Sequence, residues 1–474
     1  MNTIHFPDYS IIAGKQVRGE GERIDIINPA NEQVLSSISA INPAQFDAAV
    51  SAAQAAFPLW RDLGDGKRTE LLLQAADVLE QHADEIATLI TLEQGKVLGL
   101  AQFEMQGTLA WLRYTAGLQI PVDILEDSDS KRIELHHEPI GVVGSITPWN
   151  WPVMIAMWHM VAALKAGNVV INKPSEYTPL STVRMVEVLN QVLPSGVLQA
   201  VVGKGDVGAA FSAHAGIQKM VFTGSTPTGQ AIYKSGAAFM RPLTLELGGN
   251  DAAIVLPDVN VAEVAAKIYG GAFINGGQTC AALKRLYVHE SIYAELTQAL
   301  TDIADAVVLG DGMDANSQLG PVQNKMQFDK VNHYLQDALN NGARVLTQNS
   351  AKPESGYFIR PTIVVDIANA VALVREEQFG PVLPVVSYSS VDEAIAMAND
   401  MEFGLGGSVW SQDLAAAQTI AAQMQTGTVW INGHAEVAPH APFGGWKLSG
   451  LGAEFGIDGL LANTRQKAVH VYKA

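Results

Sequence analysis

The stretch GVVGSITPWNWPVMIAMWHMVAALKAGNVVINKP, residues 141–174, holds the pattern that decides the fold. GVVGSI (141–146) and NVVINKP (168–174) are short apolar runs typical of buried strands, and residues 152 to about 167 between them predict a helix. Strands that alternate with helices of about 10–15 residues indicate βαβ units and a parallel sheet. Because ligands bind where the carboxyl ends of such strands meet helix N-termini, we expect the functional site there.

The same alternation continues toward the C-terminus. Residues 181–193 predict a second helix, and LQAVVG and KMVFTG (219–224) predict further strands, each followed by a helix. A second alternating region begins near residue 251, and its strand candidates are KRLYVH (284–289), GARVLT and TGTVWIN (426–432). The chain is therefore predicted to have the α/β class of fold.

The segments outside these two regions differ in character. Short strands and turns are expected around IIAGKQV (11–17), and residues 42 to about 118 have the apolar spacing of helices. Residues 121–138 interrupt this pattern with an acidic turn, EDSDSKR, and a candidate extended strand. The tail QKAVHVYKA alternates enough to be a strand added to the sheet of another molecule.

Composition excludes several classes of protein. With 474 residues, 48% hydrophobic and 16% charged, the chain is long and apolar enough for two or three globular domains. A net charge of −18, with scattered basic residues, argues against a nucleic-acid partner. A single cysteine cannot form a disulfide within the chain, and neither a signal peptide nor an apolar run of about 20 residues that could span a membrane is found. We expect a cytoplasmic protein without a membrane partner.

Cys280 is the only cysteine and lies in GGQTCAA, residues 276–282. A lone cysteine is commonly a small buried hydrophobic residue. Here small, flexible neighbours would leave the thiol reachable, and free backbone N–H groups beside it could stabilise a thiolate or an oxyanion. Cys280 is therefore a candidate nucleophile.

Glu246 ends an apolar strand in LTLELGGND and is followed by two glycines. A carboxyl group in apolar surroundings has a raised pKa and can act as a general base, whereas the alternative is a strand-end glutamate paired with an arginine. The glycines would let a ligand approach the backbone closely.

Asn150 lies in TPWNWP, directly after the strand at 141–146. Its side-chain amide could donate a hydrogen bond to a developing oxyanion. The same side chain could instead cap the helix that begins at Pro152.

Two strand ends suggest nucleotide binding. FTGSTPTG (222–229) joins a strand to a helix and offers a phosphate-sized anion site, although its glycines are spaced more widely than in the GxGxxG fingerprint. INKPSE ends a strand with Lys173 and Glu176. An acidic residue at this position accepts hydrogen bonds from a ribose diol and repels a 2′-phosphate, while the alternative is two solvated loop charges.

Seven motifs in this order and spacing resemble the aldehyde dehydrogenase superfamily, in its hydrolytic, acid-forming type, over nearly the whole chain. They are PWN, KPSE, FTGST, LELGG, GQTC, EEQFGP (376–381) and PFGGWKLSG (442–450). The resemblance implies a Rossmann-like parallel-sheet cofactor domain, an α/β catalytic domain and a small β hairpin used in oligomerisation.

The resemblance also implies the boundaries of these parts. The NAD-binding domain is expected in residues 1–119 and 140–248, and the catalytic domain in residues 249–447. Segments 120–139 and 460–474 are expected to pair with another subunit, which implies a homodimer or a homotetramer.

Individual roles follow from the same resemblance. Cys280 becomes the nucleophile, Glu246 the base for the deacylating water, and Asn150 the oxyanion donor together with the backbone N–H of Cys280. Lys173 and Glu176 are expected at the adenosine ribose, Ser225 at the pyrophosphate and Glu377 at the nicotinamide ribose. The full set of expected NAD-binding residues is Trp149, Lys173, Glu176, Gly224, Ser225, Gly229, Leu247, Glu377 and Phe379. No metal site is expected.

The implied reaction oxidises a small-molecule aldehyde to its acid through a thiohemiacetal and a thioester on Cys280, with hydride transfer to NAD. A free thiol has a pKa of about 8.5, so activation is needed, and the nicotinamide, backbone amides and Glu246 are candidates. Glu176 disfavours NADP. Alternatives are an acylating enzyme that passes the thioester to coenzyme A, and a non-catalytic protein on the same fold. Glu246 weighs against the acylating enzyme, because a base that activates water would divert the thioester to hydrolysis. The intact set of Cys280, Glu246 and Asn150 weighs against a non-catalytic protein.

The aldehyde itself is predicted from one helix face. Trp151, Met154, Ile155 and Trp158 are spaced to share that face, which could pack into the core or, as the resemblance implies, line a substrate tunnel. Further tunnel residues are expected at Thr279, Val437 and Phe443. Relatives that oxidise semialdehydes of diacids usually have an arginine in this region, so an apolar aliphatic or aromatic aldehyde is expected. A betaine-type aldehyde is the alternative, because two tryptophan faces could hold a cation. The contribution of His159 stays open.

Overall fold

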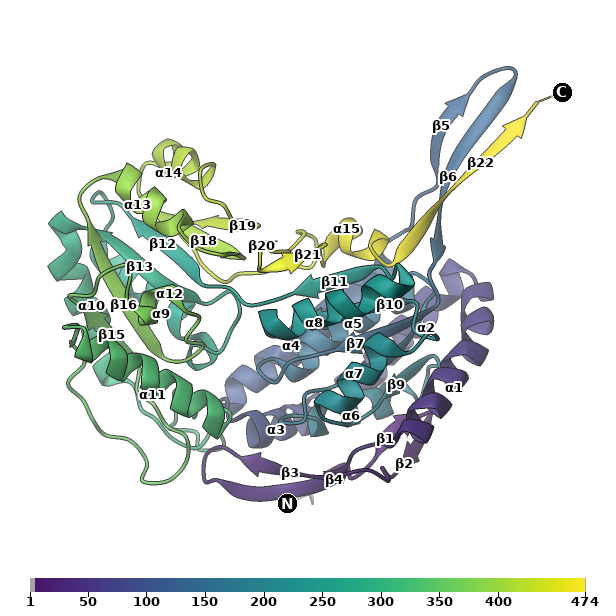
Figure 1. Ribbon diagram of the computed structural model, residues 1–474, viewed down its shortest axis with the longest axis horizontal. Coiled ribbons are helices and arrows are strands. Elements are labelled where there is room, and N and C mark those ends of the chain that lie inside the picture. Colours follow the sequence, from purple (N-terminus) through teal and green to yellow (C-terminus); the bar gives the residue numbers. More distant parts are fainter. Residues whose placement is uncertain (1–4, 474) are drawn as a thin grey trace.

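A computed structural model describes residues 5–473. Residues 1–4 and 474, which belong to the expected ranges 1–119 and 460–474, lie outside the described residues. Two sheets with packed helices form the two sides of the molecule, and an arm of three strands extends away from one of them (Figure 1). The expected α/β class is confirmed.

The first sheet has eight strands in the order β2-β1-β9-β8-β7-β10-β11-β21. They are β1 (Ser10–Ile12), β2 (Lys15–Val17), β7 (Val142–Ile146), β8 (Val169–Lys173), β9 (Leu198–Ala200), β10 (Lys219–Thr223), β11 (Leu243–Glu246) and β21 (Gly450–Leu451). The strands from β9 to β11 are parallel, and the register pairs Ile146 with both Lys173 and Phe222, and Thr223 with Glu246. The carboxyl ends of β7, β8, β10 and β11 therefore meet at one edge.

Two groups of helices pack on this sheet. The helices of this half are α1 (Pro43–Asp62), α2 (Asp65–Glu80), α3 (Ala83–Gln94), α4 (Leu98–Gly117), α5 (Pro152–Lys165), α6 (Leu180–Leu189), α7 (Gly205–Ala213) and α8 (Thr226–Gly236), with a short 3₁₀ turn η1 (Ala237–Phe239). Helices α5 and α6 pack together on β7, β8 and β9, while α1, α7 and α8 form the second group.

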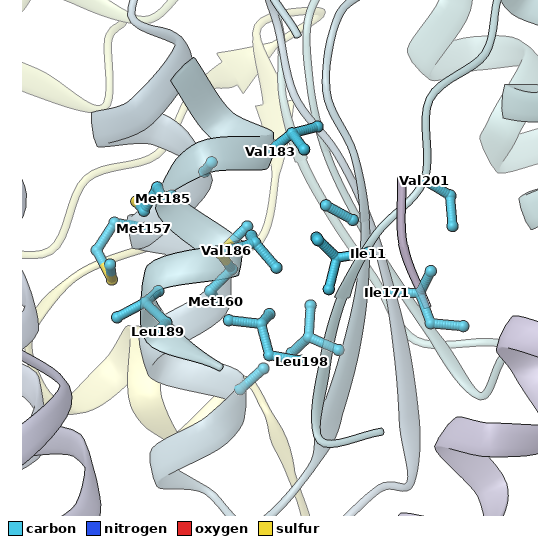
Figure 2. Close-up of a cluster of buried hydrophobic side chains, with 14 of the residues drawn as sticks. Ile11, Met157, Met160, Ile171, Val183, Met185, Val186, Leu189, Leu198 and Val201 are labelled. Carbon is cyan, nitrogen blue, oxygen red and sulfur yellow. The ribbon is translucent and has the colours of Figure 1, made fainter. Parts of the chain in front are cut away.

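The core under α5 and α6 is built from aliphatic and methionine side chains. Figure 2 shows Val186 and Leu189 of α6 facing Leu198 of the sheet, and all three are at most 2% exposed. Burying one such side chain contributes about 1.5–3 kcal/mol, so this layer fixes α5, and with it the loop before α5, onto the sheet.

The second sheet lies in residues 251–431 and has the order β14-β15-β16-β13-β12-β18-β19. Its strands are β12 (Asp251–Val255), β13 (Leu283–His289), β14 (Arg344–Val345), β15 (Thr362–Val365), β16 (Val382–Tyr388), β18 (Gly406–Trp410) and β19 (Thr428–Ile431). Its helices are α9 (Val261–Phe273), α10 (Tyr293–Ala306), α11 (Lys325–Asn340), α12 (Ala372–Arg375), α13 (Val391–Asn399) and α14 (Leu414–Ala421), with 3₁₀ turns η2 (Ile274–Gly277) and η3 (Glu290–Ile292).

The chain passes between the two sheets beside Glu246. β11 ends at Glu246, and β12 begins only five residues later at Asp251. The chain then returns near residue 450, where β21 pairs antiparallel with β11. Smaller elements complete the body: β3 (Arg23–Asn28) with β4 (Gln33–Ser39), β17 (Phe403–Gly404) with β20 (Trp446–Lys447), and α15 (Gly456–Leu461).

The arm consists of β5 (Asp123–Asp127), β6 (Lys131–Pro139) and β22 (Thr464–Tyr472). β22 runs antiparallel to β6 along its whole length, from Thr464 opposite Pro139 to Tyr472 opposite Lys131. The tail therefore pairs with the chain's own hairpin, and its expected addition to the sheet of another molecule stays a prediction. β5 and β22 are left as the edge strands of this small sheet.

No helix within residues 5–473 is both long and apolar enough to cross a membrane.

Candidate active site

Cys280 lines two cavities. The wide cavity has a volume of about 790 Å³ and contains all seven residues expected to contact the substrate. They are Trp151, Met154, Ile155, Trp158, Thr279, Val437 and Phe443. The narrow cavity, of about 280 Å³, is lined by Asn150 and by six of the expected NAD residues, namely Trp149, Gly224, Ser225, Leu247, Glu377 and Phe379. A group bound in either cavity would therefore meet Cys280.

A left-handed turn presents the nucleophile. Asn275, Gly276 and Gly277 have φ values of 51°, 64° and 73°. A Cβ on Gly277 would lie 2.3 Å from the carbonyl oxygen of Gly380, so only glycine fits where this turn packs against the EEQFGP segment. The close packing ties the Cys280 turn to the segment that carries Glu377.

Charges around Cys280 oppose each other. The pKa of its thiol is raised to about 12, mainly by burial and also by the carboxylates of Asp251, Glu377 and Glu246, although the ammonium of Lys284 lowers it. The charge of Glu246, one of the candidate activating groups, therefore disfavours the thiolate. Activation must come from a positive charge or from hydrogen-bond donors that face the sulfur.

Asn150 is fixed by hydrogen bonds at both ends. Its side-chain Nδ2 donates to the backbone carbonyl of Gln278 at 2.9 Å, and its backbone carbonyl oxygen accepts from Lys96 Nζ at 2.8 Å and from Asn275 Nδ2 at 2.9 Å. One N–H of the Asn150 amide is used by Gln278, which leaves the second to point elsewhere.

The alternative in which Asn150 caps α5 is wrong. The residue before the helix is Trp151, and no side chain of the cap position bonds the helix. Glu104 on α4 does this instead, because its Oε1 accepts from the backbone N–H groups of Val153 and Met154. Glu104 and Lys96 form a fully buried ion pair at 2.7 Å, and the Lys96 Nζ lies 3.7 Å from the centre of the Trp151 ring.

Glu246 is 4% exposed, and neither of its carboxyl oxygens has a hydrogen-bond partner within the described residues. Burial, followed by the negative charge of Glu454, raises its pKa well above the usual range. The arginine partner considered as an alternative is absent from the described part of the chain. A buried carboxyl group of this kind keeps its proton to a higher pH than an exposed one and acts as a general base once it is deprotonated.

The two glycines after Glu246 serve neighbouring protein groups. A Cβ on Gly248 would lie 2.6 Å from Glu377 Oε2, and a Cβ on Gly249 would lie 2.7 Å from the carbonyl oxygen of Cys280. The Gly249 N–H donates to Glu377 Oε1 at 3.1 Å. Because these two glycines have no side chain, the Glu377 carboxylate and the Cys280 carbonyl can approach the backbone that follows Glu246.

The lining of the narrow cavity has features that suit a dinucleotide. Trp149 and Phe379 stand edge to face with their ring centres 5.4 Å apart. Ser225 precedes α8 without bonding its backbone, so the first N–H groups of that helix remain available for a phosphate. Gly229, also expected here, is buried against Leu247, because a Cβ would lie 2.4 Å from that side chain.

Lys173 and Glu176 do not line the narrow cavity. Lys173 is 4% exposed and its Nζ lies 3.4 Å from Glu176 Oε2, and burial lowers its pKa. The alternative of two solvated loop charges is thus wrong for Lys173. Both residues lie at the carboxyl end of β8, beside the end of β7 that leads to Asn150.

Several aromatic side chains line the wide cavity. Trp111 and Trp158 have ring centres 5.5 Å apart, and both pack against Phe455. No arginine lines this cavity within residues 5–473, but Lys267 and Glu436, both exposed, belong to its wall. The wall is therefore apolar around Cys280 and carries one charge of each sign where it is exposed.

His159, unassigned from the sequence, points away from the wide cavity. Its Nδ1 lies 2.9 Å from Ser145 Oγ and its Nε2 lies 2.9 Å from Thr223 Oγ1 and 3.2 Å from Glu454 Oε1. His159 thus joins the sheet to the carboxylate that faces Glu246.

Five buried polar residues near the site escaped the sequence reasoning. They are Lys96, Glu104, Lys284, His434 and Glu454. Charged side chains are rarely buried unpaired, so Lys284 at the start of an apolar strand was a usable signal. His434 lines the wide cavity, and burial lowers its pKa to about 3, so its ring is neutral. Nothing in its sequence context marks it out.

Comparisons with known proteins agree with this geometry. Residues 16–469 match the sequence model of the aldehyde dehydrogenase family. The chain is 38% identical over 467 residues to the aldehyde dehydrogenase LUC3 of a Fusarium species, with 98% of this chain and 99% of that protein covered. It is 35% identical to a phenylacetaldehyde dehydrogenase of Pseudomonas fluorescens, with 96% and 93% covered, and 38% identical to a chloroplastic betaine aldehyde dehydrogenase of Beta vulgaris, with 92% and 91% covered.

Among solved structures, the NAD⁺ complex of an aldehyde dehydrogenase from Bacillus cereus is similar over 99% of this chain and 97% of that chain. The TM-score is 0.96 and the sequence identity is 36%.

Proposed function

The chain belongs to the aldehyde dehydrogenase family, and from this we propose that it oxidises an aldehyde to its carboxylic acid with NAD as the hydride acceptor. The observation that carries the proposal is the position of Cys280 in the walls of both cavities. An aldehyde in the wide cavity and a nicotinamide in the narrow one would meet at this thiol.

The residues of the chain divide the work of this reaction. The Cys280 thiolate attacks the aldehyde carbon, and the free N–H of Asn150 with the backbone N–H of Cys280 stabilises the alkoxide. NAD, when bound, accepts the hydride, so the carbon is oxidised and a thioester remains on the sulfur. Glu246 then takes a proton from water, which attacks the thioester and releases the acid and the thiolate.

The proposed NAD site rests on the narrow cavity and on the neighbouring strand ends. Glu377 is positioned by Gly249 for a ribose, and the N-terminus of α8 offers backbone N–H groups for the pyrophosphate. Glu176 would accept hydrogen bonds from the adenosine ribose and repel a 2′-phosphate, so we propose NAD over NADP. The likeness to an NAD⁺ complex supports the cofactor class.

We propose an apolar aliphatic or aromatic aldehyde as the substrate. The aromatic wall around Cys280 supports this, and so does the similarity to a phenylacetaldehyde dehydrogenase. A betaine-type aldehyde is the second candidate, because the tilted pair of Trp111 and Trp158 could face a cation and a betaine aldehyde dehydrogenase is among the relatives. Glu246 opposes transfer to coenzyme A, because hydrolysis would divert the thioester.

We also propose the division into domains that the sequence predicts. We assign NAD binding to residues 1–119 and 140–248, and catalysis to residues 249–447. The edge strands β5 and β22 carry exposed apolar side chains, including Ile124, Leu125 and Val471. Such edges favour pairing with a further strand, so the arm would join subunits into a dimer or tetramer.

NADH release with four aldehydes tests the proposal. Hexanal and benzaldehyde should give higher kcat/KM values than betaine aldehyde or succinic semialdehyde. A preference for betaine aldehyde would select cation recognition, and a preference for succinic semialdehyde would reject the apolar wall. No NADH with any aldehyde, from protein that binds NAD, would contradict the oxidation itself.

A further inference from the structure

Lys284 is the second residue of β13 and lies four residues after Cys280, and its side chain is 2% exposed. Its Nζ donates hydrogen bonds to the carbonyl oxygens of Thr279 at 2.8 Å and of Cys280 at 2.5 Å. A third contact, at 3.5 Å, reaches Oε1 of Glu377. This buried ammonium group therefore makes both of its short hydrogen bonds to the backbone of Thr279 and Cys280, next to the nucleophilic sulfur.

Burial of an ammonium group is unfavourable unless hydrogen bonds or an opposite charge compensate it. Here the compensation comes mainly from two neighbouring peptide carbonyls and only at longer range from Glu377. Because each carbonyl lies on one side of Cys280, their positions are fixed relative to the ammonium. A single buried side chain, that of Lys284, therefore fixes the backbone on both sides of the Cys280 Cα.

The bonded peptides also contain the N–H groups nearest to the sulfur. The Thr279 carbonyl and the Cys280 N–H belong to the same peptide group, and the Cys280 carbonyl shares its peptide with the Ala281 N–H. A carbonyl that accepts a charge-assisted hydrogen bond polarises its peptide, which strengthens the N–H on the other side as a donor. Lys284 would therefore strengthen the backbone donor assigned to the oxyanion.

We propose that Lys284 is a positioning residue for the nucleophile: its ammonium group holds the Cys280 turn by two carbonyls and supplies the positive charge that favours the thiolate. This inference rests on the proposed role of Cys280 and adds the group that activates it.

The other charged groups around the thiol support the assignment. Asp251, Glu377 and Glu246 face Cys280 from β12, from the segment before β16 and from the end of β11, and each of them raises the pKa of the thiol. His434 is held neutral, in part by the charge of Lys284 itself. Lys284 is the cation that acts in the opposite direction on the sulfur.

The test measures the rate of Cys280 alkylation by iodoacetamide as a function of pH, without aldehyde or NAD. Cys280 is the only cysteine, so the reaction reports this thiol alone. Lys284→Gln keeps an N–H donor and removes the charge, Lys284→Met removes both, and Lys284→Arg keeps the charge. Lys447→Met is the matched control, because Lys447 Nζ also donates to two backbone carbonyls, those of Asn399 and Met401, and lines neither cavity.

Loss of the charge should move the alkylation midpoint to higher pH by about one unit, so the rate at pH 8 should fall about tenfold in Lys284→Gln and Lys284→Met. Lys284→Arg and Lys447→Met should keep the wild-type midpoint. A merely structural role would reduce the folded fraction and leave the midpoint in place. If Lys284→Met does not fold, Lys284→Gln decides the question.

A wild-type midpoint in folded Lys284→Gln, or an equal shift in Lys284→Arg, would overturn the proposal. These outcomes differ from a failure of the proposed function, in which alkylated wild-type protein would still form NADH from an aldehyde.

Discussion

The Nε2 atom of His159 lies 3.2 Å from Oε1 of Glu454, and the charge of Glu454 raises the pKa of the buried Glu246 carboxyl. The three side chains come from α5, from the segment after β21 and from the end of β11. Because Glu246 has no hydrogen-bond partner of its own within the described residues, its proton affinity depends first on its burial and then on this neighbour.

Replacing Glu246 should separate the two halves of the reaction. In Glu246→Gln the thiol can still form the thioester, but deprotonation of water is lost, so steady-state turnover should fall at least about 100-fold. Rapid mixing should show a burst of NADH close to one per site, followed by slow release. Cys280→Ala should show neither phase. Wild-type turnover in Glu246→Gln would show that another group is the base.

Removing the charge of Glu454 should shift the pH dependence of deacylation. Glu246 acts as a base only when it is deprotonated, so the rate rises with pH through its raised pKa. Glu454→Gln removes a negative charge, which lowers that pKa and moves the rise to lower pH by about one unit. Single-turnover thioester hydrolysis measured between pH 5 and about 9 checks this. Glu402→Gln, at an exposed position, is the control and should not move the curve.

Glu176 should control the choice of cofactor. Its carboxylate accepts hydrogen bonds from a ribose diol and repels a 2′-phosphate, so the wild type should prefer NAD over NADP. Glu176→Ser should narrow the ratio of kcat/KM values by about tenfold, which corresponds to about 1.4 kcal/mol. Equal kcat/KM values for the two cofactors in the wild type would contradict this role.

Gly107 should set the width of the wide cavity. It lies in α4, lines that cavity, and a Cβ there would be 2.8 Å from Met154 Sδ. In Gly107→Ala the Met154 side chain must move, so kcat/KM for 2-naphthaldehyde should fall by about tenfold or more, while hexanal changes little. The exposed helical residue Gly99, whose Cβ would meet no atom, provides the control Gly99→Ala. A uniform loss for both aldehydes would point to a change in folding instead.

The buried Lys96–Glu104 pair should stabilise the fold strongly. Both side chains are fully buried, so Lys96→Met leaves the Glu104 charge uncompensated and should lower the free energy of unfolding by about 3–5 kcal/mol. The exposed pair Lys325–Asp329 is the matched control, and Lys325→Met should cost at most about 1 kcal/mol. Urea unfolding measures both. Similar losses in the two variants would contradict the effect of burial.

The sequence predicted the fold well where local patterns are strong. Strands such as 141–146 and 168–174 are nearly continuous apolar runs without alternation, which is the pattern expected for strands of a parallel sheet that are buried on both faces. The pattern at 121–138 marks the hairpin as a break, but it does not predict that the tail pairs with this hairpin. Strand pairing between residues 131–139 and 464–472 is a long-range contact that no local pattern encodes.

The candidate site divides in the same way. The amino-acid sequence alone determined the α/β class. It also marked Cys280, Glu246 and Asn150, because each of these residues follows a recognisable strand or glycine pattern. The tertiary structure decided which groups surround them: it replaced Asn150 by Glu104 as the partner of the α5 N-terminus, and it brought Glu454 to Glu246 and Lys284 to the Cys280 turn. The physical reason is that pKa values and hydrogen bonds depend on burial and on charges a few ångströms away, and residues that meet in space, such as Glu246 and Glu454, lie about two hundred positions apart in the chain.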